Sequence, residues 1–185
     1  MRIIIYKKTA IFTLIFGFIS GFLTSYFSGE ETASDFGSWI QSFYQCEEIE
    51  LLLKSVFSGP VFVFATFILG LFVFGYLFVY PVNFYWAYTF GFLITSSVIC
   101  FGKESVFSII LKSPTIFSTC FFLCLESAEA MKFSTEIFTN TEFKQLRIQT
   151  SQYLGKGLSI AVFSLITTAY ETFFVPKILN LWVSF

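Results

Sequence analysis

A run of 44 residues without a charged side chain, from Ser58 to Phe101, constrains this chain more than any other feature of its sequence. Crossing the roughly 30 Å hydrocarbon core of a bilayer takes about 20 helical residues, so the run is about twice as long as one crossing requires. Its turn-forming residues are Tyr80-Pro81-Val82-Asn83. Because proline interrupts helices, we predict a helical hairpin within a membrane that turns at these four residues.

The composition of the whole chain agrees with membrane insertion. Of its 185 residues, 56% are hydrophobic and 12% are charged, whereas soluble domains carry about 25% charged residues. The pieces that remain outside the apolar stretches are about 30 residues long, too short to bury a core of their own. We therefore predict one all-α membrane domain over residues 1–185, a polytopic helical bundle.

Five apolar stretches are the candidate transmembrane helices: residues 9–27, 60–80, 84–101, 106–125 and 157–176. They leave a loop at 28–58 and a second at 126–156, which we expect to be a solvated helical hairpin. Because Lys and Arg favour the cytoplasmic side, the basic residues predict a cytoplasmic N-terminus, with 28–58 outside and 126–156 inside. The alternative is a fourth stretch that re-enters, because Lys112 and Pro114 interrupt it.

Several function classes lack their usual residues. The chain has no histidine, which removes the commonest general base and metal ligand. Its four cysteines have no CxxC spacing and no glycine-rich phosphate loop is present, so neither a zinc site nor a nucleotide site is indicated. We therefore expect a non-enzymatic protein without metal or cofactor, with membrane lipid around it and no nucleic-acid partner.

Lys112 and Glu171 lie deepest in the apolar stretches, where an ionisable residue normally has a partner or a task. Each belongs to a stripe of small or polar residues at helical spacing: Ser108, Lys112, Thr115 and Thr119 on one stretch, and Ala161, Ser164, Thr168 and Glu171 on the other. We predict that the two faces touch and that the charges pair. One interpretation is close helix packing; the other is a polar cavity for an ion or a solute.

Small residues also recur at every fourth position elsewhere. The first stretch offers Gly17 and Gly21 between Thr13 and Ser25, and the third offers Ala87 and Gly91. Such stripes mark helix contacts in membranes, either within one chain or between copies in a homo-oligomer.

The outward segment has an aromatic stripe followed by acidic residues, which predicts a short helix at the membrane surface. The stripe includes Phe36, Trp39 and Phe43, and the acidic residues are Glu47, Glu48 and Glu50. It is either an aromatic anchor for a linker or a docking surface for an extracellular partner.

Three segments together resemble the stage II sporulation protein M family of five-span bacterial membrane proteins. They are ILGLFVFGY at 68–76 with AYTFGF at 87–92, GKE at 102–104 leading to Pro114, and AYETFFVP at 169–176. The resemblance covers about two-thirds of the chain and departs from the family pattern at Ala87, Pro81 and Pro114-Thr115. It adds Gly70, Gly75, Pro114 and Pro176 to the positions expected to shape helix packing.

The resemblance implies a non-enzymatic scaffold in a bacterial cytoplasmic membrane that localises peptidoglycan-degrading partners, similar to stage II sporulation proteins P and D, during engulfment of the forespore. The competing hypothesis is a small-molecule transport component, such as the membrane substrate-binding subunit of an energy-coupling-factor importer. Its ligand would occupy a cavity lined by the Ser108, Lys112, Thr115 and Glu171 set.

Overall fold

The structure is a computed structural model that describes residues 2–44, 59–139, 143–175 and 177–178. These residues form α1 (Arg2–Tyr44), α3 (Pro60–Gly70), α4 (Gly75–Phe101), α5 (Lys103–Thr139) and α6 (Phe143–Phe173), and no strand is found among them. The predicted all-α bundle is thus confirmed.

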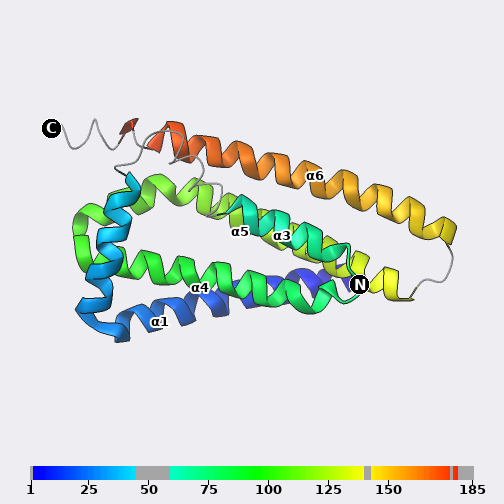
Figure 1. Cartoon of the computed structure of the whole chain (residues 1–185), viewed down its shortest axis with the longest axis horizontal. Coiled ribbons are helices and arrows are strands. Elements are labelled where there is room, and N and C mark those ends of the chain that lie inside the picture. Colours follow the sequence, from blue (N-terminus) through cyan, green and yellow to red (C-terminus); the bar gives the residue numbers. More distant parts are fainter. Residues whose placement is uncertain (1, 45–58, 140–142, 176, 179–185) are drawn as a thin grey trace.

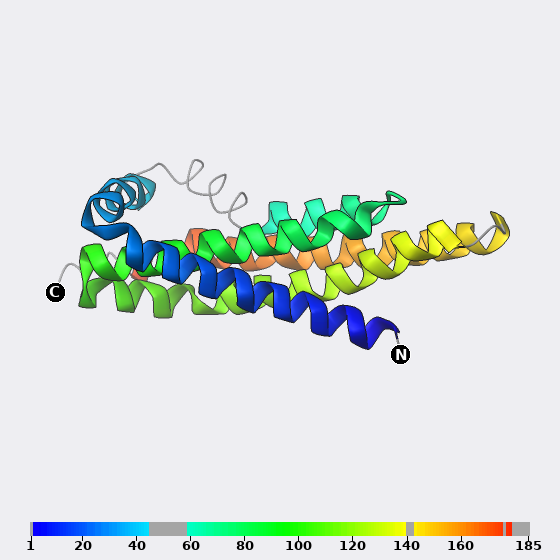
Figure 2. The same cartoon turned by 90° about the horizontal axis from the view of Figure 1, so that it is seen from below.

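The helices lie along one long axis (Figures 1 and 2). One end of the bundle, here called the Gly75 end, holds the start of α1 and the connection from α3 to α4. The other, the Gly102 end, holds the connection from α4 to α5, where Gly102 adopts a positive φ of 56°. The hairpin of α5 and α6 extends past the start of α1 at the Gly75 end, whereas the last part of α1 turns across the Gly102 end.

Three helices are long and apolar enough to cross a membrane: Ile4–Ser28 of α1, Gly75–Cys100 of α4 and Ile109–Thr139 of α5. The short helix α3 is apolar but has 11 residues, which at 1.5 Å per residue is about 16 Å. In the described part of the chain, three of the five expected stretches lie in helices that are both long enough and apolar enough to cross a membrane. The expected number of five crossings therefore stays a prediction.

The predicted hairpin exists, but its turn was misplaced. The chain reverses at residues 71–74, and Tyr80-Pro81-Val82-Asn83 lie inside α4. The predicted helices 60–80 and 84–101 are therefore wrong in their bounds. The reason is tertiary: a Cβ on Gly75 would overlap the Leu69 backbone carbonyl, so the tight reversal requires glycine at that position.

Ser134 of α5 holds the same turn by hydrogen bonds. Its hydroxyl lies 2.7 Å from the Phe72 carbonyl and 3.0 Å from the Val73 carbonyl, and it accepts a bond from the Tyr76 N–H at 3.2 Å. It thereby satisfies backbone groups that the end of one helix and the start of the next leave unpaired.

The expected interruption at Pro114 is absent, and α5 continues through it from Lys103 to Thr139. Proline cannot donate to the Ile110 carbonyl four residues earlier, and the Ser113 hydroxyl donates to that carbonyl instead, at 2.7 Å. The chain therefore does not turn at Pro114, and whether this helix crosses a membrane stays a prediction. Pro114 is exposed, and its expected role in helix packing stays a prediction as well.

Residues 126–156 form the predicted helical hairpin in their described part, but not a solvated loop. The residues of α5 that follow Leu125 are among the most buried in the molecule: Glu126, Ser127, Ala128, Ala130, Met131, Phe133 and Ser134. They are covered because α3, α4 and α6 all pack against α5.

Candidate functional site

Glu126 lies at the centre of a polar cluster between α3, α5 and α6 and has 0% exposed surface. The Tyr153 hydroxyl of α6 donates to the Phe67 carbonyl of α3 at 2.7 Å and lies 3.2 Å from Glu126 Oε1. The Tyr153 ring also stacks between Phe67 and Phe133, with ring centroids 5.4 and 4.6 Å away. One tyrosine thus connects three helices through both its ring and its hydroxyl.

Two glycines make room for this cluster. A Cβ on Gly70 would collide with the Tyr153 hydroxyl, and a Cβ on Gly157 would collide with the Phe67 ring. The same Cβ on Gly157 would lie 3.3 Å from Glu126 Oε1. Gly70, which was expected to shape helix packing, thus lies at a close helix contact, whereas Gly157 was not singled out from the sequence.

Part of the cluster remains without hydrogen bonds. Asn83 Nδ2 of α4 donates to the Ser127 hydroxyl at 2.7 Å, but Asn83 Oδ1 and Glu126 Oε2 have no partner among the described residues. A buried oxygen without a partner costs about 1–3 kcal/mol. Each of these two oxygens can therefore still accept a hydrogen bond.

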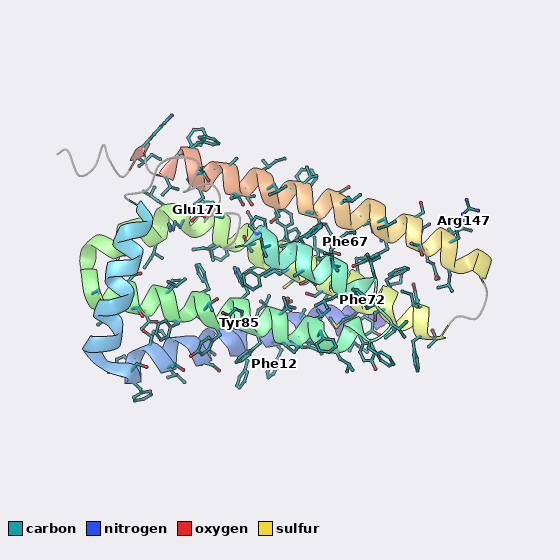
Figure 3. The ribbon with its side chains drawn as sticks, viewed as in Figure 1. Phe12, Phe67, Phe72, Tyr85, Arg147 and Glu171 are labelled. Carbon is teal, nitrogen blue, oxygen red and sulfur yellow. The ribbon has the colours of Figure 1, made fainter. Side chains whose placement is uncertain are left out.

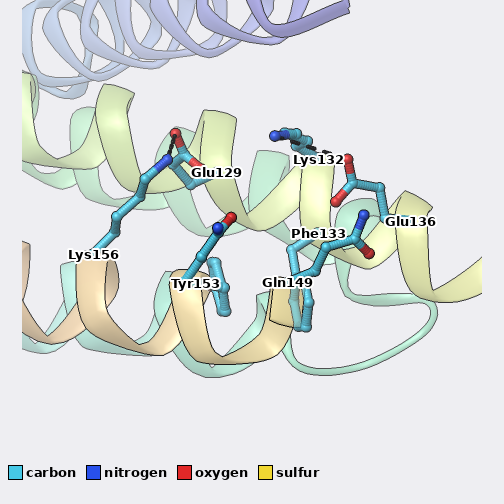
Figure 4. A pocket seen from close by; sticks show the side chains of 8 residues that line it. Glu129, Lys132, Phe133, Glu136, Gln149, Tyr153 and Lys156 are labelled. Atoms are coloured by element: carbon cyan, nitrogen blue, oxygen red, sulfur yellow. Dashed lines mark hydrogen bonds and ion pairs between the residues drawn. The ribbon is translucent and has the colours of Figure 1, made fainter. Parts of the chain in front are cut away.

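Two charged pairs lie close to Tyr153 of the cluster (Figure 4). Lys156 of α6 pairs with Glu129 of α5 at 3.1 Å, and Lys132 pairs with Glu136 at 3.8 Å within α5. These four side chains line the polar hollow, a cavity of about 120 Å³ that is completed by Phe133, Gln149, Gln152 and Tyr153.

A second and larger depression, here called the apolar groove, lies along α5 and α6 and has a volume of about 690 Å³. Its lining consists of Phe122, Leu125, Glu129, Ser151, Gln152, Gly155, Lys156, Ser159, Ile160 and Phe163. The groove therefore runs from charged residues near the Gly75 end onto apolar residues farther along the bundle.

The structure brings Lys112 and Glu171 together, as the two stripes predict, near the Gly102 end (Figure 3). Lys112 Nζ lies 3.4 Å from Glu171 Oε1, and the two side chains are 24% and 12% exposed. Thr115 of α5 and Ser164 of α6, which belong to the same two stripes, are buried. Their hydroxyl oxygens have no hydrogen-bond partner among the described residues. Neither the polar hollow nor the apolar groove is lined by Lys112 or Glu171.

The glycine stripes of α1 and α4 pack on each other within one chain. A Cβ on Gly17 would lie 2.6 Å from the Phe84 carbonyl oxygen and 3.0 Å from the Ala87 Cβ, and a Cβ on Gly21 would collide with the Tyr88 carbonyl. A Cβ on Gly91 would collide with the Phe18 carbonyl. The contact expected from these stripes is thus an internal one in this structure.

Several further predicted residues stay untested. Phe36, Trp39 and Phe43 belong to α1, but their side chains lie outside the described part of the structure. The residues Glu47, Glu48, Glu50 and Pro176, and the side chain of Ser108, lie outside it as well.

The residues that build the cluster were missed because their sequence signal is weak. Glu126 and Ser127 follow an apolar stretch and precede Lys132 and Glu136, which is the usual pattern of a helix emerging into water. The available signal was the run of small residues Ser127-Ala128 and Ala130, since small residues mark close helix contact in membrane proteins.

Comparison of the chain with protein-family models, with curated proteins and with solved structures finds no match. The resemblance to the stage II sporulation protein M family therefore rests on the sequence motifs alone.

Proposed function

We propose that this chain is a non-enzymatic membrane scaffold that holds partner proteins at the outer surface of a bacterial cytoplasmic membrane. The observation that supports this best is the Lys112–Glu171 pair. The two charges pair with each other across α5 and α6, and neither lines the polar hollow or the apolar groove. A bundle whose paired charges join its own helices suits a protein that positions others.

The end of the bundle that would face the partners is the Gly102 end. With a cytoplasmic N-terminus, the Gly75 end faces inward and the last part of α1 crosses the outward end (Figure 1). The aromatic and acidic residues between Phe36 and Glu50 follow that turn in the sequence. If the sequence resemblance holds, the partners are peptidoglycan-degrading proteins similar to stage II sporulation proteins P and D, acting during forespore engulfment.

The polar cluster favours a second candidate, a small-molecule transport component. Glu126 Oε2 and Asn83 Oδ1 are buried oxygens without a partner among the described residues, and transport sites are built from such groups. For a transport component, the sequence predicts a binding site at Lys112 and Glu171. The unpaired oxygens of the described residues favour a site at Glu126 instead.

A crosslink and pull-down from the native host tests the two functions against each other. The tag is placed on the N-terminus, and cells are taken during sporulation or, in a host that makes no spores, during growth. Recovery of peptidoglycan hydrolases supports the scaffold, and recovery of ATPase subunits overturns it in favour of transport.

A pair of variants shows whether the outward segment makes the contact. The E47Q/E48Q/E50Q chain should lose the hydrolases, because it removes three carboxylates from that segment. The control chain with Glu136→Gln, a change on α5, should retain them. Equal recovery from both would exclude the acidic segment as the docking surface.

A further inference from the structure

The polar hollow and the apolar groove adjoin, because Glu129, Gln152 and Lys156 line both. Their junction falls where the charged parts of α5 and α6 give way to uncharged ones. The uncharged parts are residues 113–125 of α5 and 157–170 of α6, and they supply Phe122, Leu125, Ile160 and Phe163 to the groove. The two depressions therefore form one amphipathic site with a charged end and an apolar end.

The direction of this site matches that of a lipid in one leaflet of a bilayer. Its charged end is near the Gly75 end, where Lys7 and Lys8 are exposed in the second turn of α1, and basic residues favour the headgroup region. Its apolar end points along the bundle toward Phe163. A lipid with its headgroup at the charged end would have its tail along the apolar residues.

The charges at the polar end select among headgroups. Lys132 and Lys156 supply two ammonium groups, and Glu129 and Glu136 supply two carboxylates within the same small hollow (Figure 4). A purely anionic headgroup would meet the two carboxylates at close range, which is unfavourable. A headgroup with both signs pairs its phosphate with the lysines and its ammonium with the carboxylates.

We propose that this site binds a phospholipid with a zwitterionic primary-amine headgroup, of the phosphatidylethanolamine class. The acyl chain lies in the apolar groove, and the phosphate and the ammonium occupy the polar hollow. The groove volume of about 690 Å³ falls within the range of about 300–1,000 Å³ found for small-molecule sites. This inference is independent of the scaffold proposal.

Gly155 provides the variant that tests the tail site. It lines the groove, and a Cβ added to it meets nothing within 4 Å, so Gly155→Trp fills the groove without disturbing the helix packing. The matched control is Leu158→Trp, because Leu158 is exposed on α6 outside the groove.

The purified full-length chain is mixed with phosphatidylethanolamine and phosphatidylglycerol of identical acyl chains, and the retained lipid is counted by native mass spectrometry. We expect the unmodified chain to prefer phosphatidylethanolamine, and Gly155→Trp to lower its retention about tenfold. Leu158→Trp should retain it at the level of the unmodified chain. Equal retention by the two tryptophan variants would overturn the tail site.

The headgroup assignment has its own variant. The double change E129Q/E136Q removes the acceptors for the ammonium and leaves both lysines, so the preference should pass to phosphatidylglycerol. An unmodified chain that already prefers phosphatidylglycerol, or a double variant that keeps the original preference, would overturn the zwitterionic assignment.

Discussion

The pair α1 and α4 and the pair α5 and α6 are held together by different means. α1 and α4 approach until backbone meets backbone, with Gly17 and Gly21 against α4 and Gly91 against α1, and a hydrogen bond of 2.9 Å joins the Ser25 and Ser96 hydroxyls. α5 and α6 are joined by ion pairs, Lys112–Glu171 and Glu129–Lys156, on either side of an uncharged stretch.

The difference reflects what can hold helices together in lipid. Apolar side chains gain little by leaving lipid for each other, so association depends on close packing or on polar contacts. The α1–α4 pair uses the first and the α5–α6 pair the second. The α1–α4 contact should therefore tolerate no larger side chain at its glycines. The α5–α6 contact should tolerate an exchange of the two charged residues of an ion pair.

The largest effect is expected from Gly21→Val, because the new side chain would collide with the Tyr88 carbonyl of α4. Overpacking of this kind costs about 1–3 kcal/mol or more, and backbone cannot move aside as a side chain can. Size-exclusion chromatography after heating in detergent should show loss of monodisperse protein. Gly155→Val is the matched control, since its Cβ meets nothing within 4 Å, and an equal loss in both would contradict the steric account.

The next effect is expected from Tyr153→Phe, which keeps the ring and removes the hydroxyl. The Phe67 carbonyl and Glu126 Oε1 then lose a donor, which costs about 1–3 kcal/mol for a buried polar group. The free energy of unfolding in a mixed-micelle denaturation measures this loss. If Glu126→Met restores none of it in the double variant, the hydroxyl and the carboxyl are not coupled.

A smaller effect is expected from Ser134→Ala, because it removes the hydrogen bonds that hold the turn between α3 and α4. The net loss should be about 1 kcal/mol and should be local. Hydrogen exchange should accelerate at the Tyr76 amide, whose acceptor is Ser134 Oγ. Thr139→Ala is the control, because the Thr139 hydroxyl is exposed and bonds its own helix; acceleration there as well would point to general loosening.

The smallest effect is expected at Lys112 and Glu171, which are partly exposed. Either single change to Ala should lower the yield of folded protein slightly, by about 0.5–1 kcal/mol for a pair of this exposure. The exchange K112E/E171K should restore most of it. Normal folding of both single variants with loss of solute binding would instead assign the pair to a transport path.

The stripes could be predicted from the sequence because helix contacts repeat every three or four residues. Depth and spacing predict the Lys112–Glu171 pair, and spacing predicts that the glycines of α1 lie at a helix contact, but not that this contact is within one chain. The turn could not, since Pro81 suggested a break that α4 absorbs, while the real turn depends on Ser134, about 60 residues later in the chain. The burial of Glu126 depends on Tyr153 and α3, which no local pattern around Glu126 reveals.

The short helix α3 has a consequence for how the chain is made. With 11 residues it is about half as long as a crossing needs. It packs on α4 and also on α5 and α6, and the Tyr153 hydroxyl of α6 donates to its Phe67 carbonyl. α3 and α4 are therefore synthesised before α5 and α6, against which α3 also packs. We expect α3 to pack in its final position only after α6 has left the ribosome, so that folding of the first half of the protein is completed after synthesis of the second half.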